Sequence, residues 1–293
     1  MRIARLLLIA HVAALGFGLA GLLIAIPHPE LWADEPRAHD VYTFGMKYAG
    51  SLHIVAGALA MFAFGVAALG WRKTGIFFAC AVPISLASEL IGTGTGWPFG
   101  NYAYTDFLGY KVLDHVPFSI PLSWFYVGFA SYLLGNAIAQ TRDLRPRTVW
   151  SVGLGVWFLT VWDLVLDPAM AHESLEVKFW TWDETGPYFG MPIQNFVGWS
   201  ATALLFMALS RFLWRADADV DRVPIWFPLA VYAANTLFAM ALSASVDLWL
   251  PILLAALLGL APATLAWRAR PTGPARPGDE PHPRRQWRVA PSR

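Results

Sequence analysis

The chain has 293 residues, of which 57% are hydrophobic and only 14% charged, and its mean hydropathy is +0.48. A soluble domain usually carries nearer a quarter charged residues, so the composition indicates a membrane protein. The net charge of +1 does not favour nucleic-acid binding, and the single cysteine, Cys80, excludes a disulfide framework and a cysteine-rich zinc site.

Eight apolar stretches occupy most of the chain, and each is long enough for a helix to cross about 30 Å of hydrocarbon. They cover residues 3–27, 48–70, 74–91, 119–139, 149–167, 193–213, 224–244 and 247–267. The sequence therefore predicts an all-α polytopic transmembrane bundle, residues 1–267, as a single domain. A signal peptide is the alternative for the first stretch, but its apolar run is long and no small-x-small cleavage site precedes His28.

Basic residues fall mainly on alternate loops, as the positive-inside rule requires. The richer set comprises Arg2, Arg5, Arg72, Lys73, Arg142, Arg145, Arg147, Arg211, Arg215, Arg222 and the arginines of the C-terminal tail. We therefore expect a multi-pass protein of the cell membrane with both termini cytoplasmic. The tail, residues 268–293, is rich in Arg and Pro and is predicted to be disordered, with membrane lipid as a neighbour.

Two long loops at the opposite end, residues 92–118 and 168–192, are rich in aromatic residues, Gly and Pro. Aromatic side chains favour the membrane interface, so an ordinary aromatic belt is one interpretation. A lid over a ligand is the other, because the loops are too long and too apolar to be plain connectors.

Polar side chains from several spans lie at the depth of these loops. Asp163 and Asp167 are four residues apart and share one helix face. Glu89, His53 and Asn195 reach the same layer from other spans, and intramembrane carboxyls usually mark function.

Most of these residues also have a structural explanation. Asp167 precedes Pro168 and could mark a helix end. Glu89 could extend to the headgroups, His53 could be a hydrogen-bonded core histidine, and Asn195 could cap a helix. Asp163, a full turn deeper, is the hardest to explain without a function.

This arrangement suits acid chemistry on a hydrocarbon. A carboxyl in apolar surroundings keeps its proton to higher pH, and aromatic faces stabilise a cation by about 2 kcal/mol when dry. Protonation of an alkene and capture of the cation by water is one outcome; isomerisation, cyclisation and proton-coupled transport are equally compatible. No histidine pair has metal-ligand spacing, so no metal site is expected.

Four motifs carry a family resemblance: ELIGTGTGWPFGNYAY at 89–104, WDLVLDPAM at 162–170, WTW at 180–182 and YFGMPIQNFVGW at 188–199. They resemble the CruF-type family of integral-membrane carotenoid hydratases. The resemblance implies cofactor-free addition of water across the terminal 1′,2′ double bond of an acyclic carotenoid. γ-Carotene, lycopene or a C50 bacterioruberin precursor is the expected substrate, with other carotenoid-pathway enzymes as partners.

Position and burial predict the roles of the candidate residues. Asp163 is the proposed general acid, with Asp167 or Glu89 holding water or tuning that acid. Residues proposed to orient water or contact substrate are Asn195, Asn101, Tyr104, Trp97, Trp162, Trp182, His53 and Asp183. A small proton-coupled transporter and a carotenoid end-group cyclase or isomerase remain the competing hypotheses.

Overall fold

The computed structural model describes residues 1–214 and 220–269, and in this part of the chain eight helices are long and apolar enough to cross a membrane. The predicted eight-span, all-α bundle is thereby confirmed. The predicted disordered tail lies outside the described residues from position 270 onward. The helical spans are Arg2–Ala25, Pro36–Leu69, Trp71–Thr95, Ser119–Thr141, Arg147–Met170, Ile193–Trp214, Trp226–Ser245 and Trp249–Arg268.

Several spans contain local changes of helix type. The elements in chain order are α1 (Arg2–Ala20), η1 (Gly21–Ala25), η2 (Pro29–Leu31), α2 (Pro36–Phe44), η3 (Gly45–Ala49), α3 (Gly50–Leu69), α4 (Trp71–Thr95), β1 (Tyr102–Tyr104), η4 (Asp106–Leu108), β2 (Lys111–Val112), β3 (Val116–Pro117), α5 (Ser119–Thr141), α6 (Arg147–Met170), β4 (Trp180–Trp182), α7 (Ile193–Trp214), η5 (Val220–Arg222), α8 (Trp226–Ser245), α9 (Trp249–Leu254), η6 (Ala255–Leu260) and α10 (Ala261–Arg268). The π-helical segments η1, η3 and η6 each continue the helix before them.

Helix α5 is the centre of the bundle, and nearly all of its side chains are buried. It packs closely on α6 because glycines remove side chains from the contact. A Cβ added to Gly135 would lie 2.6 Å from the backbone nitrogen of Gly155 and 2.8 Å from the carbonyl oxygen of Ser151. Small residues at such crossings allow helix backbones to approach, which is a common way to hold helices together in membranes.

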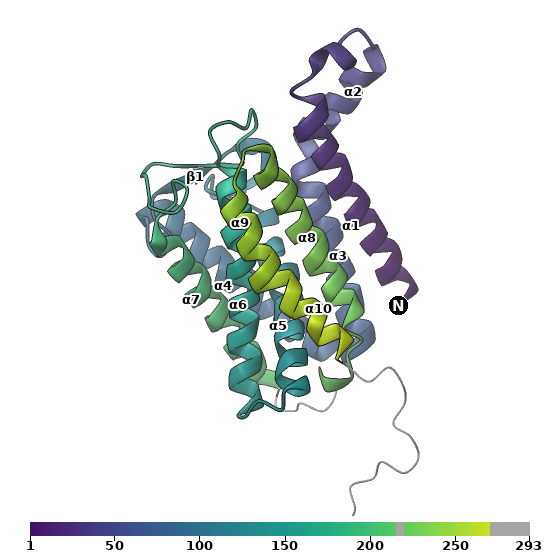
Figure 1. The fold of residues 1–293 in the computed structure, drawn as a ribbon, viewed down its shortest axis with the longest axis vertical. Helices are drawn as coiled ribbons and strands as arrows, with labels where there is room; N and C mark the ends of the chain where they lie inside the picture. The colour runs from purple at the N-terminus through teal and green to yellow at the C-terminus, as the bar shows by residue number, and fades with distance from the viewer. Residues whose placement is uncertain (215–219, 270–293) are drawn as a thin grey trace, which may run out of the picture.

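Helix α1 lies at the edge of the bundle, and the hairpin that joins it to α3 through α2 extends beyond the other helices (Figure 1). The second span begins at Pro36, a dozen residues before the predicted start, so the α2–η3–α3 rod is the longest in the described chain. Exposed apolar side chains such as Leu6, Ile9 and Ile24 cover the outer side of this region, as expected for a surface facing lipid.

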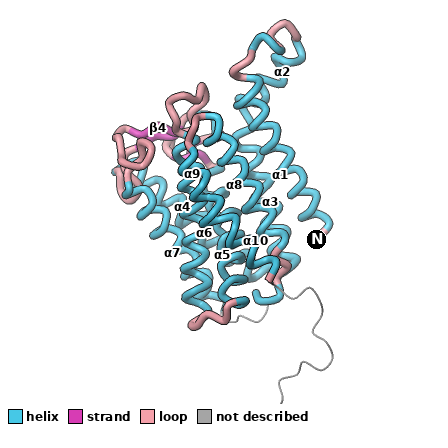
Figure 2. Tube along the Cα trace, in the orientation of Figure 1, coloured by secondary structure: helices cyan, strands magenta, loops and turns pink. Residues whose placement is uncertain are grey.

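Both aromatic loops lie at one end of the bundle and carry short strands, while helices make up nearly everything else (Figure 2). Gly96 ends α4 in the left-handed conformation, with φ of 75°, and so turns the chain into the first loop. Strand β1 then pairs antiparallel with β4 of the second loop.

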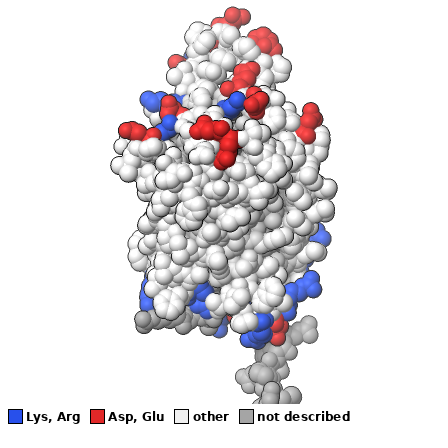
Figure 3. All heavy atoms as spheres, turned by 90° about the vertical axis from the view of Figure 1, so that its left-hand side faces the viewer, with Lys and Arg blue, Asp and Glu red and all other residues white. Residues whose placement is uncertain are grey.

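Charged residues separate along the long axis. Figure 3 shows Lys and Arg gathered mainly at the end where the N-terminus lies, Asp and Glu mainly at the loop end, and an almost uncharged belt between them. An uncharged belt of this kind is what a helical bundle presents to hydrocarbon.

The contact between α5 and α6 can be tested with valine. Gly135→Val should lower the free energy of unfolding by about 1–3 kcal/mol, because the added atoms overlap the α6 backbone. The expected result is a drop of several degrees in apparent Tm, measured by thermal unfolding of the protein in detergent.

Gly153→Val is the matched control, because an added Cβ there meets nothing within 4 Å. Equal Tm values for the two variants would contradict the close packing of α5 on α6.

Candidate active site

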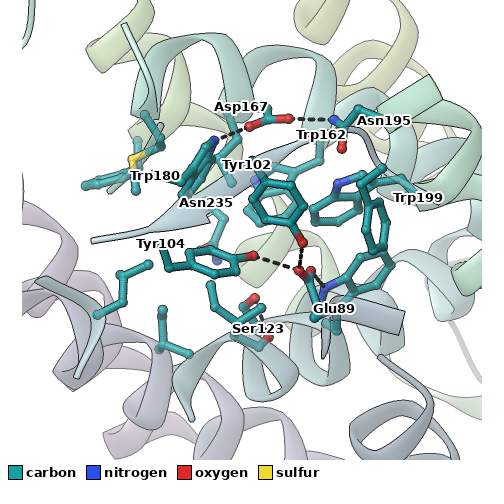
Figure 4. A pocket seen from close by; sticks show the side chains of 18 of the residues that line it. Glu89, Tyr102, Tyr104, Ser123, Trp162, Asp167, Trp180, Asn195, Trp199 and Asn235 are labelled. Atoms are coloured by element: carbon teal, nitrogen blue, oxygen red, sulfur yellow. Dashed lines mark hydrogen bonds between the residues drawn. The ribbon is translucent and has the colours of Figure 1, made fainter. Parts of the chain in front are cut away.

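A cavity of about 60 Å³ lies under the aromatic loops, enclosed by helices α3 to α8 and by the β1–β4 ribbon. Figure 4 shows its carboxyl, phenol and indole groups converging from these separate elements. Its lining comprises His53, Ile54, Glu89, Phe99, Tyr102, Tyr104, Leu108, Ile120, Ser123, Trp124, Tyr126, Trp162, Leu166, Asp167, Met170, Trp180, Trp182, Asn195, Trp199, Asn235 and Phe238. We call this cavity the acidic chamber.

The β1–β4 ribbon forms the roof of the chamber. In this antiparallel pair Tyr102 lies opposite Trp182, and Tyr104 lies opposite Trp180. Successive side chains of a strand point to opposite faces, so these four rings face the chamber while the residues between them are exposed. The loops therefore form a lid over a cavity, an arrangement that favours the lid interpretation over an ordinary aromatic belt.

Glu89 of α4 is buried and accepts three hydrogen bonds. The Tyr102 hydroxyl donates to its Oε2, the Tyr104 hydroxyl donates to the same oxygen at 2.9 Å, and Trp124 Nε1 donates to Oε1 at 2.9 Å. Burial, and after it the nearby Glu89, raise the pKa of both phenols well above their ordinary value of 10, so both remain protonated donors.

The two aspartates of α6 are bridged by one side-chain amide. Asn195 Nδ2 donates to Asp167 Oδ2 at 2.5 Å and to Asp163 Oδ2 at 3.1 Å, while Trp180 Nε1 donates to Asp167 Oδ1 at 2.5 Å. Asp167 lines the chamber, whereas Asp163 is fully buried but does not line it. The amide thus connects a chamber-facing carboxyl with a deeper one.

Three buried polar atoms at this site have no hydrogen-bond partner within the described residues: Asp163 Oδ1, Trp162 Nε1 and Trp182 Nε1. Both indoles line the chamber. Unpaired buried donors are uncommon in folded proteins, and these two N–H groups could donate to a water molecule or a hydroxyl in the chamber.

Indole rings make up much of the apolar wall. Trp124 stacks on Trp199 with 3.9 Å between ring centroids, and Trp162 meets Trp199 edge-on at 5.9 Å. Such ring faces carry negative electrostatic potential and can stabilise a positive charge that develops in front of them.

The structure brings together most of the residues proposed from the sequence, but not all. Those that line the chamber are Glu89, Asp167, Asn195, His53, Tyr104, Trp162 and Trp182. Trp97, Asn101 and Asp183 lie outside it and are exposed, Trp97 by 67%. The backbone NH of Asp183 donates to the Asn101 carbonyl at 2.9 Å, so this pair extends the ribbon and does not contact the chamber.

Sequence reasoning assigned no role to Trp124, Trp199, Tyr102 or Trp180, all of which line the chamber. The alternation in Tyr102-Ala-Tyr104 and Trp180-Thr-Trp182 was the available signal for the ribbon, since period two is typical of a strand. The other two lie in apolar helices, where nothing in the sequence distinguishes a chamber wall from ordinary packing.

The fold and the site define a multi-pass membrane protein with a buried acidic chamber under a lid of aromatic residues. The chain belongs to the family of carotenoid biosynthesis proteins, whose model matches residues 49–262. It is 30% identical over 281 residues to bisanhydrobacterioruberin hydratase of Haloarcula japonica, covering 88% of this chain and 82% of that protein. No solved structure matches the chain. The resemblance read from the four motifs is thereby confirmed.

The ribbon predicts a specific cross-link. Ala103 and Thr181 are opposite each other and exposed, and opposite residues have Cα atoms about 5.5 Å apart, within the range of a disulfide. Under mild oxidation the double variant Ala103→Cys/Thr181→Cys should lose both maleimide-reactive surface thiols.

The pair Ala103→Cys/Thr185→Cys is the control, because it is out of register by four residues. Equal cross-linking of both pairs would contradict the pairing of β1 with β4.

Proposed function

We propose that this protein is a carotenoid hydratase that adds water across the terminal 1′,2′ double bond of an acyclic end group, without a cofactor. The observation that carries the proposal is the acidic chamber, where two cavity-facing carboxyls, Glu89 and Asp167, lie among indole and phenol rings. The relative from Haloarcula japonica is named as a hydratase of bisanhydrobacterioruberin, which supports the same reaction class here.

The size of the chamber supports an open-chain end group. An apolar cavity of about 150 Å³ holds one benzene molecule. The acidic chamber, at about 60 Å³, is smaller than that, so a ring would require its walls to move. A slender acyclic end with two terminal methyl groups makes the least demand on this space.

The reaction requires one proton transfer to carbon and one water. A carboxylic acid protonates C2′, the electron pair of the double bond forms the new C–H bond, and the positive charge rests on the tertiary carbon C1′. Water then bonds to C1′ and returns a proton to the carboxylate, so that the acid is regenerated. The product is a tertiary alcohol at C1′.

Asp167 is the proposed donor, in place of the deeper Asp163 favoured by the sequence alone, because Asp167 is the aspartate that lines the chamber. Asp163 shares the bridging amide of Asn195 and is proposed to position and tune Asp167. Two carboxyls held this close in apolar surroundings tend to share one proton, which keeps an acid available.

Glu89 is proposed to act as the negative partner of the cation. Its carboxyl group is the acceptor in all three of its hydrogen bonds, which is the arrangement that suits an ionised carboxylate. The unpaired N–H groups of Trp162 and Trp182 are proposed to hold the attacking water. Trp124 and Trp199 supply ring faces to the cation, an interaction of about 2 kcal/mol in a dry site.

We propose the cell membrane as its location, and the distribution of charge supports an orientation with the basic end on the cytoplasmic side. The lid and the acidic chamber would then lie at the outer face. Membership in a family of biosynthesis proteins favours catalysis over the proton-coupled transport that the sequence left open.

Expression in a lycopene-producing bacterium tests the reaction. We expect pigments that gain the mass of one or two water molecules, detected by mass spectrometry after chromatography. Lycopene is compared with γ-carotene and a C50 acyclic carotenoid to identify the preferred substrate. An altered absorption spectrum at unchanged mass would contradict hydration and indicate cyclisation or isomerisation.

The role of Asp167 is tested by Asp167→Asn, which keeps the shape of the side chain but removes the transferable proton. Product formation should fall by about 10²–10⁴-fold, the usual contribution of a general acid. Asp183→Asn, in the exposed loop, is the matched control and should stay within about twofold of the wild type. Wild-type turnover by Asp167→Asn would exclude it as the donor.

A further inference from the structure

A second cavity lies beside the acidic chamber, between the N-terminal hairpin and the rest of the bundle, with a volume of about 420 Å³. We call it the N-terminal groove. The hairpin contributes Phe17, Gly18, Ala20, Gly21, Leu22, Ile24, Ala25, Ile26, Trp32, Ala38, Val41, Tyr42, Gly45, Met46 and Ala49, and the remaining walls are Gly50, His53, Phe107, Met170, Val177, Phe179 and Phe238.

The walls of the groove are almost entirely apolar. Among its few polar side chains, Trp32 donates its indole N–H to the carbonyl of Ala25 at 2.6 Å, and His53 Nδ1 lies 3.1 Å from the carbonyl of Ala49. These groups are satisfied within the protein, so the groove offers little to a polar ligand and suits a hydrocarbon.

The groove adjoins the acidic chamber. His53, Met170 and Phe238 line both cavities, and we call this shared boundary the neck; the His53 and Phe238 rings stack there at a centroid distance of 5.7 Å. A long molecule with its end in the acidic chamber would cross this boundary to reach the apolar groove.

The small volume of the acidic chamber means that most of a carotenoid substrate must lie beyond the neck. A carotenoid is about as long as the hydrocarbon core of a bilayer is thick, roughly 30 Å. The acidic chamber, at about 60 Å³, can hold only its tip. The remaining chain needs an apolar path that begins at the chamber, and the groove provides about seven times the chamber's volume.

Two features of the hairpin leave this space open: small residues and altered helix geometry. Gly18, Gly21, Gly45 and Ala49 lie on the groove wall, and at Gly21 an added Cβ would meet nothing within 4 Å. The π-helical segments η1 and η3 both line the groove, and such segments are frequent at functional sites.

We propose that the N-terminal groove binds the polyene chain of the substrate while its end group occupies the acidic chamber, an inference that rests on the proposed hydratase function. The occupant is a linear conjugated hydrocarbon, which enters between α1 and α2 and passes His53 and Phe238. The groove thereby sets the affinity for long substrates, and the acidic chamber sets the chemistry.

Gly21→Trp fills the groove, and Gly16→Trp is its matched control. Gly16 lies on the same helical span, Arg2–Ala25, lines no part of the groove, and likewise has nothing within 4 Å of an added Cβ. Each variant is purified from lycopene-producing cells in an Asp167→Asn background, and bound pigment per protein is measured by absorbance. Gly21→Trp should reduce the bound pigment per protein by about tenfold or more relative to the Asp167→Asn background, and Gly16→Trp should leave it unchanged.

Kinetic measurements on the same variants are the second test of the groove. In the active background Gly21→Trp should raise the KM for lycopene by about tenfold or more. It should leave kcat/KM unchanged for a short acyclic isoprenoid hydrocarbon that bears the same end group, because that probe ends near the neck. Ala49→Phe, on η3, repeats both measurements in case Gly21→Trp does not fold.

Equal pigment retention and equal KM in the groove variant and its control would overturn the groove assignment. So would a wild-type preparation that carries phospholipid but no pigment, by mass spectrometry. Failure of the proposed function is distinct: the wild type would then hydrate neither the long nor the short hydrocarbon, while pigment binding would still report on the groove.

Discussion

The rest of the structure depends on the hydrogen bonds that its buried carboxyl groups accept inside an apolar bundle. A buried carboxyl without partners is strongly unfavourable, so each must be met by N–H or O–H groups from elsewhere in the chain. Glu89 finds its donors on the first loop and on α5, and Asp167 finds them on the second loop and on α7. These bonds connect elements that are distant in sequence.

The lid follows from the same requirement. Of the inward side chains of the ribbon, Tyr102, Tyr104 and Trp180 all donate to the carboxyls below them, and Trp182 is the exception. The loops are therefore ordered by the acids that they cover. A lid held in this way separates the buried carboxyls from the exposed loop surface, and a lower local dielectric strengthens electrostatic interactions among groups buried in this way.

The sequence predicted what hydropathy and spacing determine: the eight spans, and the common depth of Glu89, Asp163, Asp167 and Asn195. It could not determine which side of a helix faces a cavity, because that depends on how the helices rotate when they pack. Asp163 and Asp167 share one face of α6, yet only Asp167 lines the acidic chamber. Asp183 directly follows β4, where strand alternation turns Trp182 inward and leaves Asp183 outside. Trp97 lies before β1, in the exposed turn that follows α4.

A buried polar network lies between the acidic chamber and helix α1. His11 of α1 contacts the His53 carbonyl at 2.7 Å and Asn235 at 3.0 Å, and the Tyr126 hydroxyl donates to Asn235 at 2.7 Å. Gly57 leaves room for it, since an added Cβ would lie 2.9 Å from the His11 ring. Polar networks inside an apolar core fix one arrangement among several of similar packing energy. Because α1 is otherwise held mainly by apolar contacts, this network fixes its position against α3 and α8, the two helices that carry His53 and Phe238 of the neck.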